Sequence, residues 1–169
     1  EEQYGAEELA LTNPLTNLAT VQFKLGNFAQ AIENYRRSLN ILQAKSTIAD
    51  KAQIRPLHGL GISLLGALDP EQAVIALKRA ADLSRNTDGL YNIGQVEFID
   101  ALIDAYAATG RWPEADKEAG YALRVEEAAY GRSSPKLLAR LDKLARWHEA
   151  QRRYTSERAL YERALSILD

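Results

Sequence analysis

The apolar residues of this 169-residue chain recur mainly at intervals of three and four positions. This spacing gathers them on one face of an α-helix, and no stretch keeps the alternation of a half-buried β-strand. Turn and helix-breaking residues interrupt the pattern at 25–27, 68–70, 109–111 and 151–153. The pattern therefore predicts an all-α protein of four helix-turn-helix units, with about eight helices.

The four units are copies of one repeat with a period of 42 residues. A leucine recurs at this period and is followed each time by a small or apolar residue: Leu18-Ala19, Leu60-Gly61, Leu102-Ile103 and Leu144-Ala145. A second column lies 13 residues after the leucine: Ala31, Ala73, Ala115 and Glu157. The shared period predicts a single repeat domain over 1–169, with units near 6–45, 48–87, 92–129 and 135–168.

The breaks between helices carry capping chemistry. Asp69 and Gln72 have the spacing of a capping box, and Pro70 stands where a first helical residue has no N–H partner to lose. Pro14 and Pro56 are also one period apart, so both open the first helix of their unit or both kink a longer one. Helix-forming residues precede each proline and favour the kink.

These columns resemble the tetratricopeptide repeat, in which a Leu-small pair is followed by a turn glycine with an aromatic, then alanine, an aromatic and Ala-Leu. The first unit matches with Leu18-Ala19, Gly26, Phe28, Ala31, Tyr35 and Ser38-Leu39. The period exceeds the usual 34 residues and resembles that of the kinesin light chain type. Departures from the pattern are Leu68 and Arg152 for the turn glycine, Glu157 for alanine, and Ala119 for an aromatic.

The resemblance implies a right-handed α-solenoid whose concave groove is lined by the first helix of each unit. It implies a protein–protein interaction module, that is, a scaffold or adaptor that holds a peptide or protein segment in this groove. An enzymatic activity is not expected. The outward columns of the first helices, together with Asn17 of the first unit, supply the groove candidates: Asn13, Thr16, Asn17, Thr20, Lys24, Arg55, His58, Glu97, Asp100, Asp104, Asp142 and Arg146.

Glu97, Asp100 and Asp104 form an acidic stripe along one predicted helix. Like charges at this spacing destabilise a helix unless something compensates them. One interpretation is a patch for a basic or amide-rich peptide; the other is a solvated face neutralised by Arg55 or Arg146 from the flanking units.

Asn13, Asn17, Phe23 and Lys24 offer a second surface, where asparagine side chains could hydrogen-bond an extended peptide. Ordinary solvent-facing polar residues are the alternative. Family members that grip a C-terminal carboxylate use Lys, Asn and Arg in the groove. The comparable positions here hold Thr16, Thr20 and Gly59, so that clamp is not expected.

Composition excludes several other classes of function. The formal net charge of −2 gives no field that would attract nucleic acid, and no apolar run is long enough for membrane insertion. With no cysteine and two histidines in different units, neither a metal site nor a cofactor is expected. The glycine-rich segment 59–66 lacks a preceding strand and the lysine of a phosphate loop, and therefore indicates close helix packing.

Two further expectations concern the whole chain. It begins with Glu1 and contains no methionine, which indicates a processed protein or a fragment that could have lost a signal peptide. The long unit and the absent cysteine favour a bacterial protein, cytoplasmic or periplasmic. The alternative function is structural: Tyr161, Leu165 and Leu168 would leave the last helix apolar and exposed, so that stacking of terminal repeats would give a homo-oligomer.

Overall fold

The computed structural model describes residues 8–45 and 51–169, in which the chain forms eight α-helices and no strand. They pair as α2 (Thr12–Lys24) with α3 (Phe28–Lys45), α4 (Ile54–Gly66) with α5 (Pro70–Asp88), α6 (Val96–Ala108) with α7 (Trp112–Tyr130), and α8 (Leu138–Ala150) with α9 (Tyr154–Leu168). Short 3-10 helices at Lys51–Gln53, Ile93–Gln95 and Pro135–Leu137 lead into α4, α6 and α8. The predicted all-α repeat fold is confirmed.

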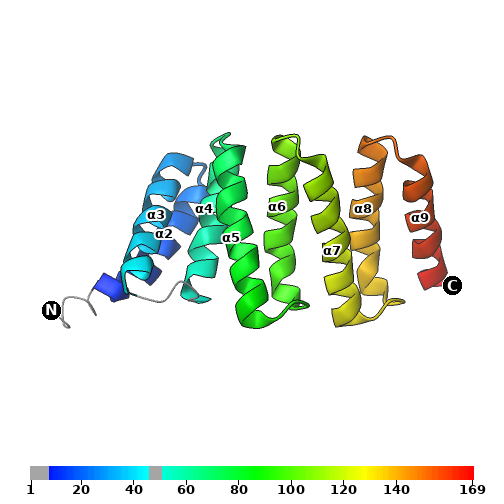
Figure 1. The fold of residues 1–169 in the computed structure, drawn as a ribbon, viewed down its shortest axis with the longest axis horizontal. Helices are drawn as coiled ribbons and strands as arrows, with labels where there is room; N and C mark the ends of the chain where they lie inside the picture. The colour runs from blue at the N-terminus through cyan, green and yellow to red at the C-terminus, as the bar shows by residue number, and fades with distance from the viewer. Residues whose placement is uncertain (1–7, 46–50) are drawn as a thin grey trace.

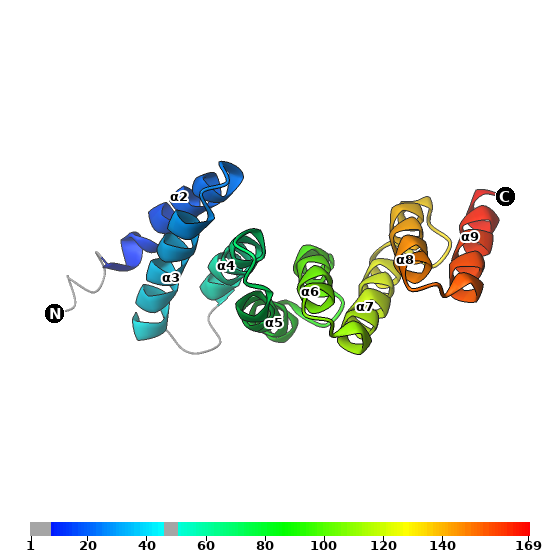
Figure 2. The same cartoon turned by 90° about the horizontal axis from the view of Figure 1, so that it is seen from above.

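The four hairpins stand side by side in chain order as an α-solenoid (Figure 1). Within each hairpin the two helices pack together, and the second helix then packs against the first helix of the next hairpin. Seen from above, α2, α4, α6 and α8 follow the inner side of a shallow arc, whereas α3, α5 and α7 follow its outer side (Figure 2). The first helices therefore form the concave face.

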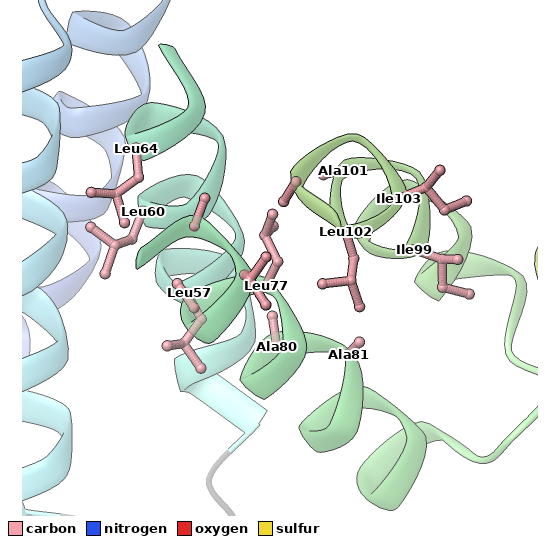
Figure 3. Close-up of a cluster of buried hydrophobic side chains, with 14 of the residues drawn as sticks. Leu57, Leu60, Leu64, Leu77, Ala80, Ala81, Ile99, Ala101, Leu102 and Ile103 are labelled. Atoms are coloured by element: carbon pink, nitrogen blue, oxygen red, sulfur yellow. The ribbon is translucent and has the colours of Figure 1, made fainter. Parts of the chain in front are cut away.

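The repeated leucine is buried wherever a preceding hairpin covers it. Leu60 points toward α3 and Leu102 toward α5 (Figure 3), and both are buried, as is Leu144. Leu18 stands in the same column but is 50% exposed, because no hairpin of the described residues covers that flank of α2. The column is thus a core position only in a unit that has a neighbour on its N-terminal side.

Segment 59–66 is part of α4, and its glycines allow neighbouring helices to pack closely against it. A Cβ added to Gly59 would collide with the ring of buried Tyr35, and one added to Gly61 would collide with the side chain of Leu77. A Cβ at Gly66 would meet the ring of Phe28 at 2.5 Å. These glycines let neighbouring side chains reach the backbone of α4, as predicted for small residues at a helix interface.

Pro14 and Pro56 are each the third residue of a helix, α2 and α4 respectively. In this first turn the backbone N–H has no partner within the helix, so proline removes no hydrogen bond. The expected kink in a longer helix is wrong for Pro56, which follows only the 3-10 helix Lys51–Gln53, while 48–50 lie outside the described residues. Before Pro14, helical residues 8–10 are separated from α2 by a turn at Leu11.

Each hairpin turn needs one residue with a left-handed backbone, always at the same position of the repeat. Gly26 and Gly110 have φ angles of 77° and 71°, whereas Leu68 and Arg152 adopt 61° and 57° at the equivalent positions. In this conformation the Cβ of any other residue clashes with the backbone, whereas glycine has no Cβ and is not strained. Two of the four turns are therefore strained where the residue departs from the repeat pattern.

We predict that Leu68→Gly raises the free energy of unfolding by roughly 0.5–1 kcal/mol, because relief of the left-handed strain exceeds the added chain entropy of glycine. Leu68 is 88% exposed, so little apolar burial is lost. Chemical denaturation followed by circular dichroism measures the change. Leu68→Ala is the matched control, since alanine keeps the steric penalty; equal effects of the two substitutions would refute the strain explanation.

Candidate functional site

The candidate site is the concave face formed by α2, α4, α6 and α8. The predicted groove residues that reach its surface are Asn13, Asn17, Lys24, Arg55, Glu97, Asp104 and Arg146, all of them exposed. The remaining candidates are buried or half-buried and contact other side chains of the fold: Thr16, Thr20, His58, Asp100 and Asp142. The outward columns inferred from the repeat are therefore only partly available to a guest.

On α2, two predicted groove hydroxyls are used to hold α3. Thr16 is buried, and its Oγ1 lies 3.0 Å from the Oγ of Ser38. The Oγ1 of Thr20 lies 2.9 Å from the hydroxyl of Tyr35. The placement of Thr16 in the groove is wrong, because that position of α2 faces the small residue Ser38 and turns into the hairpin.

The N-terminal part of the concave face brings together residues from two hairpins. Arg55 donates a hydrogen bond from Nη2 to the Oδ1 of Asn17 at 2.9 Å. Asn13 and Arg55 line a pocket of about 190 Å³ that lies where α2, α3 and α4 meet, with the buried Thr16 and Ser38 in its wall. Lys24, at the opposite end of α2, does not line this pocket. Of the predicted second surface, Asn13 and Asn17 therefore lie beside a cation of the next unit.

His58 packs between the second and third hairpins. Its ring centroid lies 4.9 Å from that of Phe98, at an interplanar angle of 58°. Burial lowers the pKa of His58 from its ordinary value, and the negative charge of Glu97 acts in the opposite direction. The imidazole is therefore a neutral packing residue at pH 7 that fills the joint between α4 and α6.

Asp100, the middle of the acidic stripe, belongs to an ion-pair cluster that joins three helices. Arg140 of α8, 7% exposed, binds both carboxylate oxygens of Asp100, with Nη1 to Oδ1 at 2.6 Å and Nη2 to Oδ2 at 3.0 Å. The same guanidinium donates from Nε to Glu126 of α7 at 3.0 Å. Lys143 adds a second cation, with Nζ 3.0 Å from Asp100.

This cluster decides between the two interpretations of the stripe. Burial alone would raise the pKa of Asp100, but the hydrogen bonds and charges of Arg140 and Lys143 bring it below its usual value. The stripe is thus neutralised at its centre. The expectation that Arg55 or Arg146 would neutralise it is wrong: Arg55 binds Asn17, and Arg146 pairs with Asp142 of its own helix at 3.0 Å.

Asp104, one turn further along α6, has a different environment. It forms no hydrogen bond or ion pair with the other described residues. Desolvation by the surrounding protein raises its pKa, Lys143 lowers it, and Asp100 raises it further. Asp104 is therefore the carboxylate of this wall that a ligand cation would stabilise most directly.

Asp104 borders a pocket that sequence reasoning missed. The pocket, about 250 Å³ in volume, lies between the third and fourth hairpins and has mostly apolar walls. Its lining includes Ile103, Asp104, Ala119, Leu144, Arg146 and Trp147. The available signal was Ala119, which stands where the repeat pattern expects an aromatic.

Trp147 is held in the wall of this pocket by Asp116 of α7. Its indole Nε1 donates to Asp116 Oδ1 at 2.7 Å, and Arg153 donates to the other oxygen at 2.6 Å. Although partial burial acts to raise the pKa of Asp116, these hydrogen bonds lower it. The ring centroid of Trp112 lies 5.8 Å from that of Trp147. Both tryptophans therefore have a packing role.

The described residues contain no cluster of three His, Cys, Asp or Glu side chains that could bind a metal ion. In the same part of the chain, no helix combines the length and apolar character that a membrane span requires.

Comparisons with known proteins agree with this architecture. Residues 8–86 match the family described as tetratricopeptide repeat. A kinesin light chain-like protein of nearly identical TPR-like repeats from Podosopora anserina is similar in structure, with a TM-score of 0.79 and 20% identity over 94% of this chain and 75% of that one. BtubC (BKLC) from P. vanneervenii is also similar, with a TM-score of 0.81 and 19% identity over 93% of this chain and 63% of that one. No curated protein matches in sequence.

We predict that Arg140→Ala destabilises the fourth hairpin by about 3–5 kcal/mol, because Asp100 and Glu126 lose a buried cation that both share. Amide hydrogen exchange in α8 and α9 should accelerate much more than in α2 to α5. Arg146→Ala is the matched control: its ion pair with Asp142 is exposed and should contribute less than about 1 kcal/mol. Unchanged exchange in α8 would show that the cluster does not hold this joint.

Proposed function

We propose that this chain, a tetratricopeptide repeat protein, is a protein-interaction module that binds an extended segment of another protein along the concave face of α2, α4, α6 and α8. The observation that carries the proposal is a pair of open pockets that the first helices help to line, one beside Asn13 and Arg55 and the other beside Asp104. Both lie at joints between hairpins, where a segment crossing the first helices would meet them in turn.

The chemistry of the two pockets supports a polypeptide guest. Asn13 and Arg55 supply amide and guanidinium groups that can bind the carbonyl groups of an extended backbone. The second pocket supplies apolar walls for a side chain and a carboxylate at its rim. The role is that of a scaffold or adaptor without catalysis, as is general for helical-repeat folds of this type.

A peptide-binding experiment tests this proposal. Peptides are selected from a random library on the immobilised chain, and the best binders are titrated into the isotope-labelled protein. We expect amide shifts in α2, α4, α6 and α8, and a loss of affinity in Arg55→Glu. Arg37→Glu, an equal charge reversal on exposed α3, is the control. Binders that shift only α3, α5 and α7 would contradict a concave site.

The second candidate function is self-assembly, and one observation favours it. Leu18 and Val21 of α2 and Leu25 at its C-cap are exposed, and Leu18 stands at a position that is buried in the other units. At the other end of the solenoid, Tyr161, Leu165 and Leu168 are exposed on α9. A second copy that placed its α9 against α2 would bury both apolar surfaces, and such a head-to-tail contact can propagate.

Under this second function we predict that the average mass from light scattering rises with protein concentration. Leu18→Lys should return the chain to monomer, because it places a charge in the centre of the contact. Ile75→Lys, at an exposed apolar residue of α5 away from both ends, should leave the assembly intact. A constant monomer mass over the whole concentration range would exclude self-assembly.

A further inference from the structure

Two positions of the repeat lie on the two helices that meet at each joint between hairpins. One lies on the second helix of each unit: Tyr35, Leu77, Ala119 and Tyr161. The other lies on the first helix, just before the repeated leucine: Asn17, Gly59, Ala101 and Lys143. At the first joint Tyr35 lies against Gly59, so a large side chain meets a glycine. The second joint has the same order of sizes, with Leu77 and Ala101.

At the third joint the order of sizes is reversed, because the small residue is Ala119 and the long one is Lys143. Lys143 does not fill the space that a large residue at 119 would occupy, since its Nζ extends to Asp100. The two first helices also stand further apart: Cα atoms approach within 8 Å between α2 and α4 and between α4 and α6, but not between α6 and α8. The apolar pocket of about 250 Å³ occupies this gap.

The charged residues around the pocket favour a guest that carries a positive charge. Its three basic residues are already paired within the fold: Arg140 with Asp100 and Glu126, Lys143 with Asp100, and Arg146 with Asp142. Asp104 is the lining carboxylate, and it has no such partner among the described residues. A group that enters the pocket therefore meets apolar walls and one carboxylate that Lys143 influences by its charge but that forms no ion pair or hydrogen bond with the other described residues.

We propose that the pocket at Ala119 binds a large apolar side chain, aromatic or leucine, of a guest peptide in which a lysine or arginine stands next to it and pairs with Asp104. The guest side chain takes the place that Tyr35 takes at the first joint. This inference rests on the proposed function, to which it adds the chemistry of the bound segment. Apolar anchors that fill a pocket commonly dominate the binding energy of such interfaces.

Three short synthetic peptides of equal length test the proposal by titration into the isotope-labelled chain. The first has one phenylalanine flanked by lysines, the second has alanine in place of phenylalanine, and the third has glutamates in place of the lysines. The first should shift the amides of Ile103, Ala119 and Leu144 and the indole N–H of Trp147. The second and third should bind about tenfold more weakly or worse.

Substitutions then separate the two parts of the site. Ala119→Tyr, which fills the pocket with the residue of the first unit, should weaken the first peptide about tenfold or more. Ala119→Leu, with the residue of the second unit, is a further filling variant if the ring is not accommodated. Ala128→Tyr adds the same ring at an exposed position of α7 and should leave binding unchanged. Asp104→Asn should weaken binding about two- to fivefold.

The outcomes distinguish this inference from the proposed function. Equal binding of the alanine peptide, equal binding to a folded filling variant, or tighter binding of the glutamate peptide would overturn the inference. If library-selected peptides still shift α2 and α4, the concave binding function stands without this pocket. If the lysine-phenylalanine peptide shifts the pocket residues but no library peptide shifts α2 or α4, the pocket stands and the extended concave site fails.

Discussion

The packing of each helical hairpin against the next is the interaction on which the rest of this structure depends. A hairpin covers one apolar face by itself, and its other face is covered only by a neighbour. The repeated leucine shows this directly: Leu60, Leu102 and Leu144 are buried under the preceding hairpin, whereas Leu18 is half exposed. The position of every groove residue follows from these joints, because each joint sets how far apart two first helices stand.

The joints are not equivalent, although the repeat is regular. The first is apolar and close, with the ring of Tyr35 against the backbone of Gly59. The third combines a guanidinium cluster, in which Arg140 binds Asp100 and Glu126, with an open apolar pocket beside Ala119. Desolvation offsets much of the attraction in such a buried ion pair, while its hydrogen bonds tie α6, α7 and α8 together. The third joint can therefore hold its geometry while leaving a space that the other joints fill.

Charge pairing within the fold determines what the concave face offers to a partner. The acidic stripe of α6 does not act as one patch, since Arg140 and Lys143 occupy Asp100. What remains is a carboxylate at Asp104 beside apolar walls, and an amide and guanidinium pair at Asn17 and Arg55 near the other end of the arc. The face thus presents separate sites of different chemistry, one at the first joint and one at the third.

The sequence by itself determined the all-α fold, the four hairpins, the 42-residue period and the unusual turn residues Leu68 and Arg152. Helical periodicity and turn chemistry are local, so residues a few positions apart are enough to read them. Only the tertiary structure decided which groove candidates are free. Thr16 turns into Ser38, and Asp100 binds Arg140, across 22 and 40 residues of chain. Such pairings depend on how closely two hairpins approach, which the repeat pattern of either hairpin does not contain.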